Sequence, residues 1–236
     1  MTTDKLKWLA DQGATFALPK GRTKDKFETD WPNKPHCLAE ASAHAKRGGN
    51  VGILTGKHSN NIVALDRDID FPGTVAMMGN WGETAKIIRS NAPDRGKLLY
   101  QVLGSLPDST VYKPNGEKHP HAELLANGRH ALGPTSQYNG GDYILQDAEL
   151  GIMEVTPAEL DYIWWSITSQ HCYPEFAPKE PEHGDTTQTS KEYVQAVKDA
   201  WSTIDVFNHF QKDSNGTEER KGQTRILGNG GLDVRQ

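Results

Sequence analysis

The sequence has few cysteines and no long apolar run. Its 236 residues include two cysteines, Cys37 and Cys172, far apart and in no Cys-X-X-Cys pair. This argues against a zinc finger or a disulfide scaffold and favours a reducing compartment. No apolar run reaches the roughly 18 residues of a transmembrane helix. The first residues also lack a signal-peptide layout, so we expect a cytoplasmic protein with no membrane partner.

Excess positive charge is also lacking, since the net charge is −5. Its distribution is uneven, however. Residues 1–146 hold 18 Lys and Arg against 15 Asp and Glu, whereas residues 147–236 hold 8 against 16. The first part is therefore mildly basic, which is compatible with phosphate binding but does not establish it. The last part is an acidic appendage.

Short elements separated by Gly, Pro, Asn and Asp predict an α+β fold rather than a regular βαβ repeat. Helices are expected near the N-terminus and at 37–46, with a shorter helix at about 73–80. Strands are expected at 16–18, 51–54, 62–66, 86–89, 98–103, 110–113, 122–126, 129–132 and 143–146.

The chain changes character near residue 156. We expect a catalytic core at 1–155, a helix and linker at 156–188, and a helical accessory segment at 189–236. Thr156-Pro157-Ala158-Glu159 has the pattern of a helix start, and Pro, Glu, His and Thr dominate 171–188. The end of the sequence resembles the start of a strand, so a longer parent protein is expected.

The most informative local motif is the acidic end of the strand expected at 62–66. Asp66 and Asp68 alternate along the chain, so their side chains project to the same face. Two close carboxylates repel each other, and a divalent cation relieves this repulsion. Oxygen ligands favour Mg²⁺ or Mn²⁺ over zinc. The alternative is a solvated acidic turn.

Glu123 would complete the set if its strand neighbours that of Asp66. Three carboxylates are a typical ligand set for two divalent ions in phosphoryl or nucleotidyl transfer. The alternative is an edge-strand acid facing water. His119-Pro120-His121 has no Cys or carboxylate quartet beside it, so no zinc is expected.

Two polar segments are candidates for binding a nucleotide. The segment 89–97 is interpreted as a basic loop before a strand, and the segment 128–143 is rich in glycine. Their candidate phosphate ligands are Ser90, Asn91, Arg95, Lys97, Arg129 and Ser136. An exposed turn and a plain hairpin loop are the alternatives, and no Walker motif is present.

The order of the motifs is more specific than any one of them. The segment NVGILTG at 50–56 precedes VALDRD at 63–68 and the basic loop ending in Lys97. AEL at 122–124, GR at 128–129, GPTS at 133–136 and GDY at 141–143 follow. Over about residues 5–150 this order resembles the bifunctional primase/polymerase domain of the archaeo-eukaryotic primase superfamily. Pro19-Lys20 and Trp31 are similar to that family's entry segment.

The resemblance implies an α/β unit packed on an RRM-like unit, with the active site between them. It implies that Asp66, Asp68 and Glu123 bind two Mg²⁺ or Mn²⁺ ions for template-directed synthesis from NTPs or dNTPs. It also implies phage or plasmid replication, hence a bacterial host cytoplasm, and a helicase domain or subunit as partner. The family's middle motif carries a histidine where this chain has Lys97. His121 is a second candidate for that role.

Single-stranded DNA is the expected template. We expect its backbone to contact the basic residues of the loop at 19–35, which are Lys20, Arg22, Lys24 and Lys26. Two alternatives remain open at this point. One is a catalytically inactive nucleic-acid-binding module of a replisome, and the other is a metal-dependent nuclease on a related scaffold.

Overall fold

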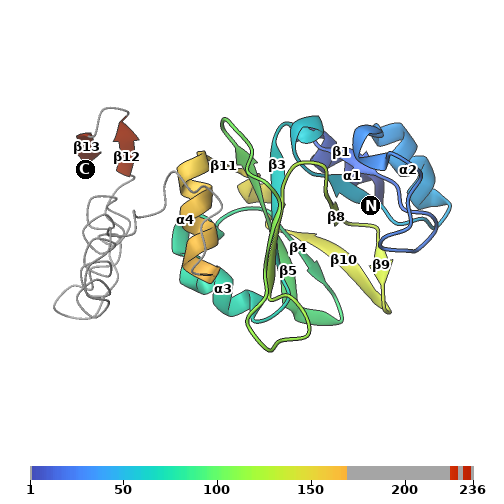
Figure 1. The fold of residues 1–236 in the computed structure, drawn as a ribbon. Helices are drawn as coiled ribbons and strands as arrows, with labels where there is room; N and C mark the ends of the chain where they lie inside the picture. Colours follow the sequence, from blue (N-terminus) through green and yellow to red (C-terminus); the bar gives the residue numbers. More distant parts are fainter. Residues whose placement is uncertain (1, 169–223, 228–230, 235–236) are drawn as a thin grey trace. The chain divides into compact units, whose positions relative to one another are not determined.

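A computed structural model describes all residues except 1, 169–223, 228–230 and 235–236. The chain divides into two units, Met1–Phe176 and Ala177–Gln236. The first unit contains helices and mainly antiparallel sheets, which confirms the predicted α+β class (Figure 1). Among the described residues, no helix has the length and apolar character needed to cross a membrane.

A small antiparallel sheet forms one layer of the first unit. It contains β1 (Thr15–Ala17), β2 (Gly52–Leu54) and β8 (His130–Leu132), in that order. Helices α1 (Thr2–Asp11) and α2 (Leu38–Lys46) pack in the same layer. The Glu40 carboxylate accepts a hydrogen bond from the Cys37 backbone N–H at 2.9 Å, which stabilises the start of α2.

A larger, eight-stranded sheet forms the second layer. Its order is β6 (Thr110–Tyr112), β7 (Ala122–Leu125), β3 (Ile62–Arg67), β5 (Ala92–Val102), β4 (Lys86–Arg89), β10 (Gly141–Gln146) and β9 (Gln137–Tyr138). The short β11 (Met153–Val155) pairs in parallel with the far end of β5. The other pairings in this sheet are antiparallel.

The two faces of the large sheet bury two different cores. On β3, Ile62 and Ala64 belong to the core shared with the small sheet, whereas Val63 and Leu65 face the other way. That second core is covered by α3 (Phe71–Met78) and α4 (Pro157–Thr168). In Figure 1 these helices lie on the side of the sheet opposite α1 and α2. Alternation along β3 therefore decides which residues face the small sheet.

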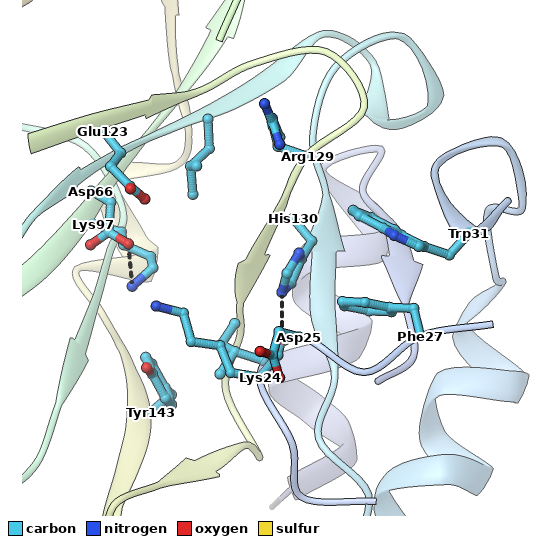
Figure 2. Close-up of a pocket in the computed structure, with 12 residues that line it drawn as sticks. Lys24, Asp25, Phe27, Trp31, Asp66, Lys97, Glu123, Arg129, His130 and Tyr143 are labelled. Carbon is cyan, nitrogen blue, oxygen red and sulfur yellow. Dashed lines mark hydrogen bonds and ion pairs between the residues drawn. The ribbon is translucent and has the colours of Figure 1, made fainter. Parts of the chain in front are cut away.

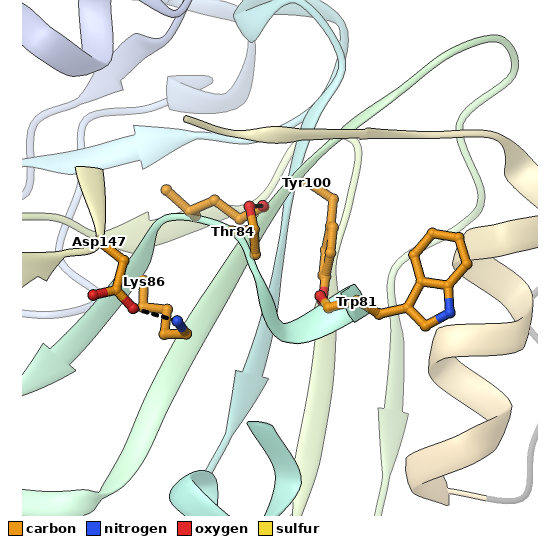
Figure 3. A network of polar contacts seen from close by, with 6 residues as sticks. Trp81, Thr84, Lys86, Tyr100 and Asp147 are labelled. Carbon is orange, nitrogen blue, oxygen red and sulfur yellow. Dashed lines mark hydrogen bonds and ion pairs between the residues drawn. The ribbon is translucent and has the colours of Figure 1, made fainter. Parts of the chain in front are cut away.

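A polar network fixes the centre of the large sheet (Figure 3). The Thr84 hydroxyl donates to the Leu99 carbonyl and accepts from the Met153 backbone N–H. The Tyr100 hydroxyl donates to the Trp81 carbonyl at 2.7 Å. Lys86, which is largely buried, pairs with Asp147. The hydrogen bonds of Thr84 and Tyr100 tie the segment before β4 to β5 and β11. The Lys86–Asp147 pair ties β4 to the residue that follows β10.

The structure corrects one prediction about the chain path. The segment 89–97 is a β-hairpin, not a loop before a strand, because β4 ends at Arg89 and β5 begins at Ala92. Only Ser90 and Asn91 form the turn. Strands β9 and β11 were not predicted, and they contain only two and three residues.

The predicted domain boundaries stay a prediction. The linker at 171–188 and the helix expected from about residue 190 lie outside the described residues. Within the segment 189–236, the structure describes one antiparallel pair, β12 (Thr224–Leu227) and β13 (Gly231–Val234).

Candidate active site

A cavity of about 250 Å³ opens between the large sheet, the small sheet and the loop after β1. Figure 2 shows Asp66, Lys97, Glu123 and Tyr143 on its large-sheet side and the stacked rings of Phe27 and Trp31 on the other. Its lining residues are Lys24, Asp25, Phe27, Trp31, Asp66, Lys97, Glu123, Leu125, Arg129, His130, Leu132 and Tyr143.

Two of the three predicted acids lie directly opposite each other. Asp66 on β3 and Glu123 on β7 are partners in the antiparallel register. Opposing residues of such a pair place their side chains on the same face. For these two it is the face of Ile62 and Ala64, which is turned toward the small sheet. The strands of Asp66 and Glu123 are therefore neighbours, as the predicted acidic site requires.

Asp68 follows just beyond the end of β3. Its backbone N–H donates to the His121 carbonyl at 3.0 Å, and its carboxylate pairs with Arg95 at 3.6 Å. It does not line the cavity. Asp68 is nevertheless close enough for its charge to raise the pKa of Glu123.

Lys97 provides a positive charge on the floor of the cavity. It is the register partner of Asp66 on β5, and its Nζ lies 3.1 Å from Asp66 Oδ2. The ammonium also lies 5.1 Å from the centre of the Tyr143 ring. Burial by itself lowers the pKa of Lys97, but electrostatic attraction to Asp66, Tyr143 and Asp68, together with the hydrogen bond to Asp66, outweighs burial and raises it. Lys97 therefore stays charged beside Asp66.

At Glu123, unlike at Lys97, burial and the neighbouring negative charges shift the pKa in the same direction. Burial raises the pKa of its carboxyl, and the negative charges of Asp66 and Asp68 raise it further. The positive charges of Lys24 and Lys97 act against this rise without cancelling it. Negative charge thus accumulates at this corner, which favours binding of a cation.

The opposite wall is aromatic. The rings of Phe27 and Trp31 stack with centres 4.3 Å apart, and His130 meets both edge-on. His130 Nε2 donates to the Lys24 carbonyl at 2.9 Å, which ties the loop to β8. Burial lowers the pKa of His130 to about 4, so its ring is neutral at neutral pH.

The donor set suits a hard divalent cation. Asp66, Asp68 and Glu123 carry carboxylate oxygens, the ligand type that Mg²⁺ and Mn²⁺ prefer. The pKa of Glu123 is raised first by burial and further by the negative charges of Asp66 and Asp68. Two of the three carboxylates are neutralised by Lys97 and Arg95. Within the part of the chain that the structure describes, no three acidic, histidine or cysteine side chains converge on one point.

Five of the six predicted nucleotide ligands divide into two groups. Lys97 and Arg129 line the cavity. Ser90, Asn91 and Arg95 lie outside its lining, on and beside the hairpin turn. The Ser90 hydroxyl accepts from the Asp142 backbone N–H at 2.9 Å, and the Asn91 amide donates to the Asn139 carbonyl at 2.8 Å.

The prediction that Ser136 meets phosphate conflicts with its burial. The residue is fully buried. Its hydroxyl accepts from the Val51 backbone N–H and donates to the Val51 carbonyl, both at 2.8 Å. A serine needs a free hydroxyl to bind a ligand, and this one is already engaged in joining the small sheet to the segment before β9.

The predicted DNA contacts point in different directions. Lys24 lines the cavity, whereas Lys20 lines a separate one. Arg22 donates to the Gly48 carbonyl at 3.3 Å and to Gln137 Oε1 at 2.6 Å. Lys26 is exposed.

Sequence reasoning missed several residues of this cavity, namely Asp25, Phe27, His130 and Tyr143. For Tyr143, alternation along the strand expected at 143–146 offered a signal, because Tyr143 and Leu145 share a buried face. For the loop residues Asp25 and Phe27 no local pattern was available. Their position depends on the contact with His130, more than 100 residues away in sequence.

Comparison with known families agrees with this geometry. A search among curated proteins finds no match to the chain. Residues 8–161, which span both sheets of the first unit, the end of α1 and the start of α4, match the family described as bifunctional DNA primase/polymerase, N-terminal. This match covers every residue of the cavity described above. The chain therefore belongs to the Prim-Pol family of bifunctional DNA primase/polymerase domains.

Proposed function

We propose that the chain catalyses template-directed nucleotidyl transfer, as a DNA primase, a DNA polymerase or both, by a two-metal mechanism. Family membership supports the coarser statement: primase/polymerase function in replication, DNA and nucleotides as substrates, and divalent metal ions. The proposal adds the residues. Asp66, Asp68 and Glu123 hold the metal ions, which are Mg²⁺ or Mn²⁺.

The observation that carries the proposal is the pairing of Asp66 with Glu123 across β3 and β7. The two carboxylates face a cavity that also contains three cationic side chains, those of Lys24, Lys97 and Arg129. A nucleoside triphosphate with its metal ions presents the complementary pattern, because phosphates seek cations and the metals seek carboxylates.

When bound, divalent ions would activate the primer 3′-hydroxyl and neutralise charge on the triphosphate. The chain's own residues then have separate parts. Lys97 and Arg129 bind phosphate oxygens inside the cavity, and Arg95 is placed to do so from its edge. Ser90 and Asn91, on the hairpin turn outside the cavity, are further candidates for binding phosphate. Ser136 is left out because its hydroxyl is engaged by Val51.

Lys97 also accounts for the missing histidine of the family's middle motif. A lysine holds phosphate as a point charge, and this one already lies beside Asp66. His121 is less suited to that part, since it does not line the cavity.

We further propose a phage or plasmid replication system, with a helicase domain or subunit as partner. The proposed template contacts are Lys20, Arg22, Lys24 and Lys26. Lys24 is the best placed of them because it lines the cavity.

The test is a two-armed synthesis assay on the wild-type chain. Both arms contain mixed NTPs and dNTPs with either Mg²⁺ or Mn²⁺, and only one contains a primer annealed to the template. Extension in the primed arm supports polymerase activity, and products in the unprimed arm add primase activity. Single-strand binding without synthesis would favour an inactive binding module. Degradation of labelled DNA without nucleotide consumption would favour a nuclease.

A further inference from the structure

A second cavity, of about 210 Å³, lies beside the candidate active site. It is formed by the end of β1, the loop that follows, and α2. Its lining residues are Ala17, Leu18, Lys20, Glu28, Trp31, Lys34, His36, His44 and Arg47. Apart from Lys20, the motifs described above assign no role to the charged residues of this cavity.

The charges of this cavity are predominantly positive and available. Lys20, Lys34 and Arg47 are exposed, and none of them has an ion-pair partner among the described residues. Glu28 is the one carboxylate in the lining. Three unpaired cations around one hollow, against a single acid, favour a ligand that carries several negative charges.

The two histidines of the lining already have partners. His44 Nε2 lies 2.9 Å from the Pro19 carbonyl oxygen, and His36 Nδ1 lies 3.4 Å from a Glu40 carboxylate oxygen. They shape the cavity by fixing the loop and α2 relative to each other. The groups free to hold a ligand are therefore the three cations.

Trp31 connects this cavity to the candidate active site, because its side chain lines both. The ring is only partly buried, and it stacks on Phe27 (Figure 2). An aromatic ring between a basic hollow and a catalytic cavity is a typical arrangement for single-stranded nucleic acid. In such sites cations follow the backbone and bases stack on exposed rings.

We propose that this cavity binds the phosphodiester backbone of the single-stranded template, which reaches the active site past Trp31. Lys20, Lys34 and Arg47 contact successive phosphates, and Trp31 offers its ring to a base. The inference rests on the proposed function, which requires the template strand to lead from this cavity to the active site. The phosphates of a free nucleotide share this chemistry, so the experiment separates the two ligands.

The test measures binding of a labelled single-stranded oligonucleotide by fluorescence anisotropy over a range of salt concentrations. Buffers contain EDTA and no nucleotide, so catalytic failure does not affect the result. The Lys34→Ala/Arg47→Ala variant is expected to raise the Kd roughly tenfold or more. Its salt slope should fall by about 1.4, since each lost phosphate contact to a single strand removes about 0.7.

Two further variants serve as controls. The charge-conserving Lys34→Arg/Arg47→Lys variant should bind within about threefold of wild type if the cations act through charge. Lys5→Ala/Lys57→Ala removes two cations that line neither cavity, and its Kd should also change little. Thermal unfolding of each variant confirms that the fold is intact.

Three results would overturn the proposal. The first is an unchanged Kd and salt slope in Lys34→Ala/Arg47→Ala. The second is equal weakening in Lys5→Ala/Lys57→Ala, which would make the effect one of net charge. The third comes from a separate titration of Lys34→Ala/Arg47→Ala with ATP in the same buffer. A loss of ATP binding with oligonucleotide binding intact would assign the cavity to a nucleotide. If the wild-type chain binds through this cavity but synthesises nothing, only the proposed function fails.

Discussion

Lys97 Nζ lies 3.1 Å from Asp66 Oδ2, and the two residues are direct register partners on β5 and β3. Both side chains are largely buried, with 10% and 13% of their surface exposed. The pair thus places a fixed positive charge beside the acid that we propose as a metal ligand. Any divalent ion bound at Asp66 must share that carboxylate with Lys97 or compete with it.

The first prediction concerns the energy of this pair in metal-free buffer. Lys97→Met and Asp66→Asn should each lower the free energy of unfolding by about 3 kcal/mol, because each leaves a buried charge without its partner. The double variant should lose less than the sum of the two, with a coupling energy of about 1–3 kcal/mol. Urea unfolding of the four proteins measures this cycle.

The exposed pair Lys7–Asp11 provides a matched control. Its side chains are 63% and 57% exposed, so its coupling energy should be about 0.5 kcal/mol or less. The buried ion pair would be contradicted if the decreases in the free energy of unfolding for Lys97→Met and Asp66→Asn were additive and no larger than those for the exposed pair.

A second prediction concerns acid stability and His130. Its pKa falls from 6.5 to about 4 in the folded state because of burial, so between these values the unfolded chain binds more protons. Stability contributed by the neutral ring is present above pH 6.5 and is lost as the pH falls toward 4. The loss should reach at most about 3 kcal/mol. Urea unfolding between pH 4 and 7 should show a flatter dependence for His130→Asn.

His119 offers the comparison for this experiment, because it is exposed. His119→Asn should keep the wild-type pH dependence. If His130→Asn and His119→Asn give the same profile as wild type, the buried neutral state of His130 is wrong.

A third prediction separates structure from ligand binding at Ser136. Removing its hydroxyl leaves the buried backbone groups of Val51 without these partners. Ser136→Ala should therefore lower the free energy of unfolding by about 1–3 kcal/mol. The KM for nucleotides should stay the same within about twofold. A large rise in KM with unchanged stability would restore the phosphate-binding role predicted from the sequence.

Local patterns were sufficient for part of the acidic side of the site. Apolar neighbours indicate a strand at 122–126. Alternation along 62–68 predicts Asp66 and Asp68 on one face, whereas in the fold Asp66 lines the cavity and Asp68, beyond the end of β3, does not. These patterns could not say which strands pair. The register of Asp66 with Glu123 depends on packing of β7 against β3, a contact between segments more than 50 residues apart.

The same limit explains the errors. The polar, basic and glycine-containing sequence of segment 89–97 predicts a loop, whereas the segment forms a hairpin of β4 and β5. In the fold, Gly96 allows the Phe71 ring to lie against β5, since a Cβ there would be 2.5 Å from the ring. The aromatic wall of Phe27 and Trp31 gave no periodic signal. It depends on the hydrogen bond between His130 and Lys24.

The role of Asp66 as a metal ligand is tested by the rate of primer extension by Asp66→Asn, measured with saturating Mn²⁺ and dNTPs. This rate should fall at least about 10³-fold, because one of the proposed metal ligands is lost. Asp108→Asn, which changes an exposed acid outside the cavity, should extend at the wild-type rate. Extension by Asp66→Asn within about tenfold of wild type would contradict the assignment of Asp66 as a metal ligand, and with it the proposed active site.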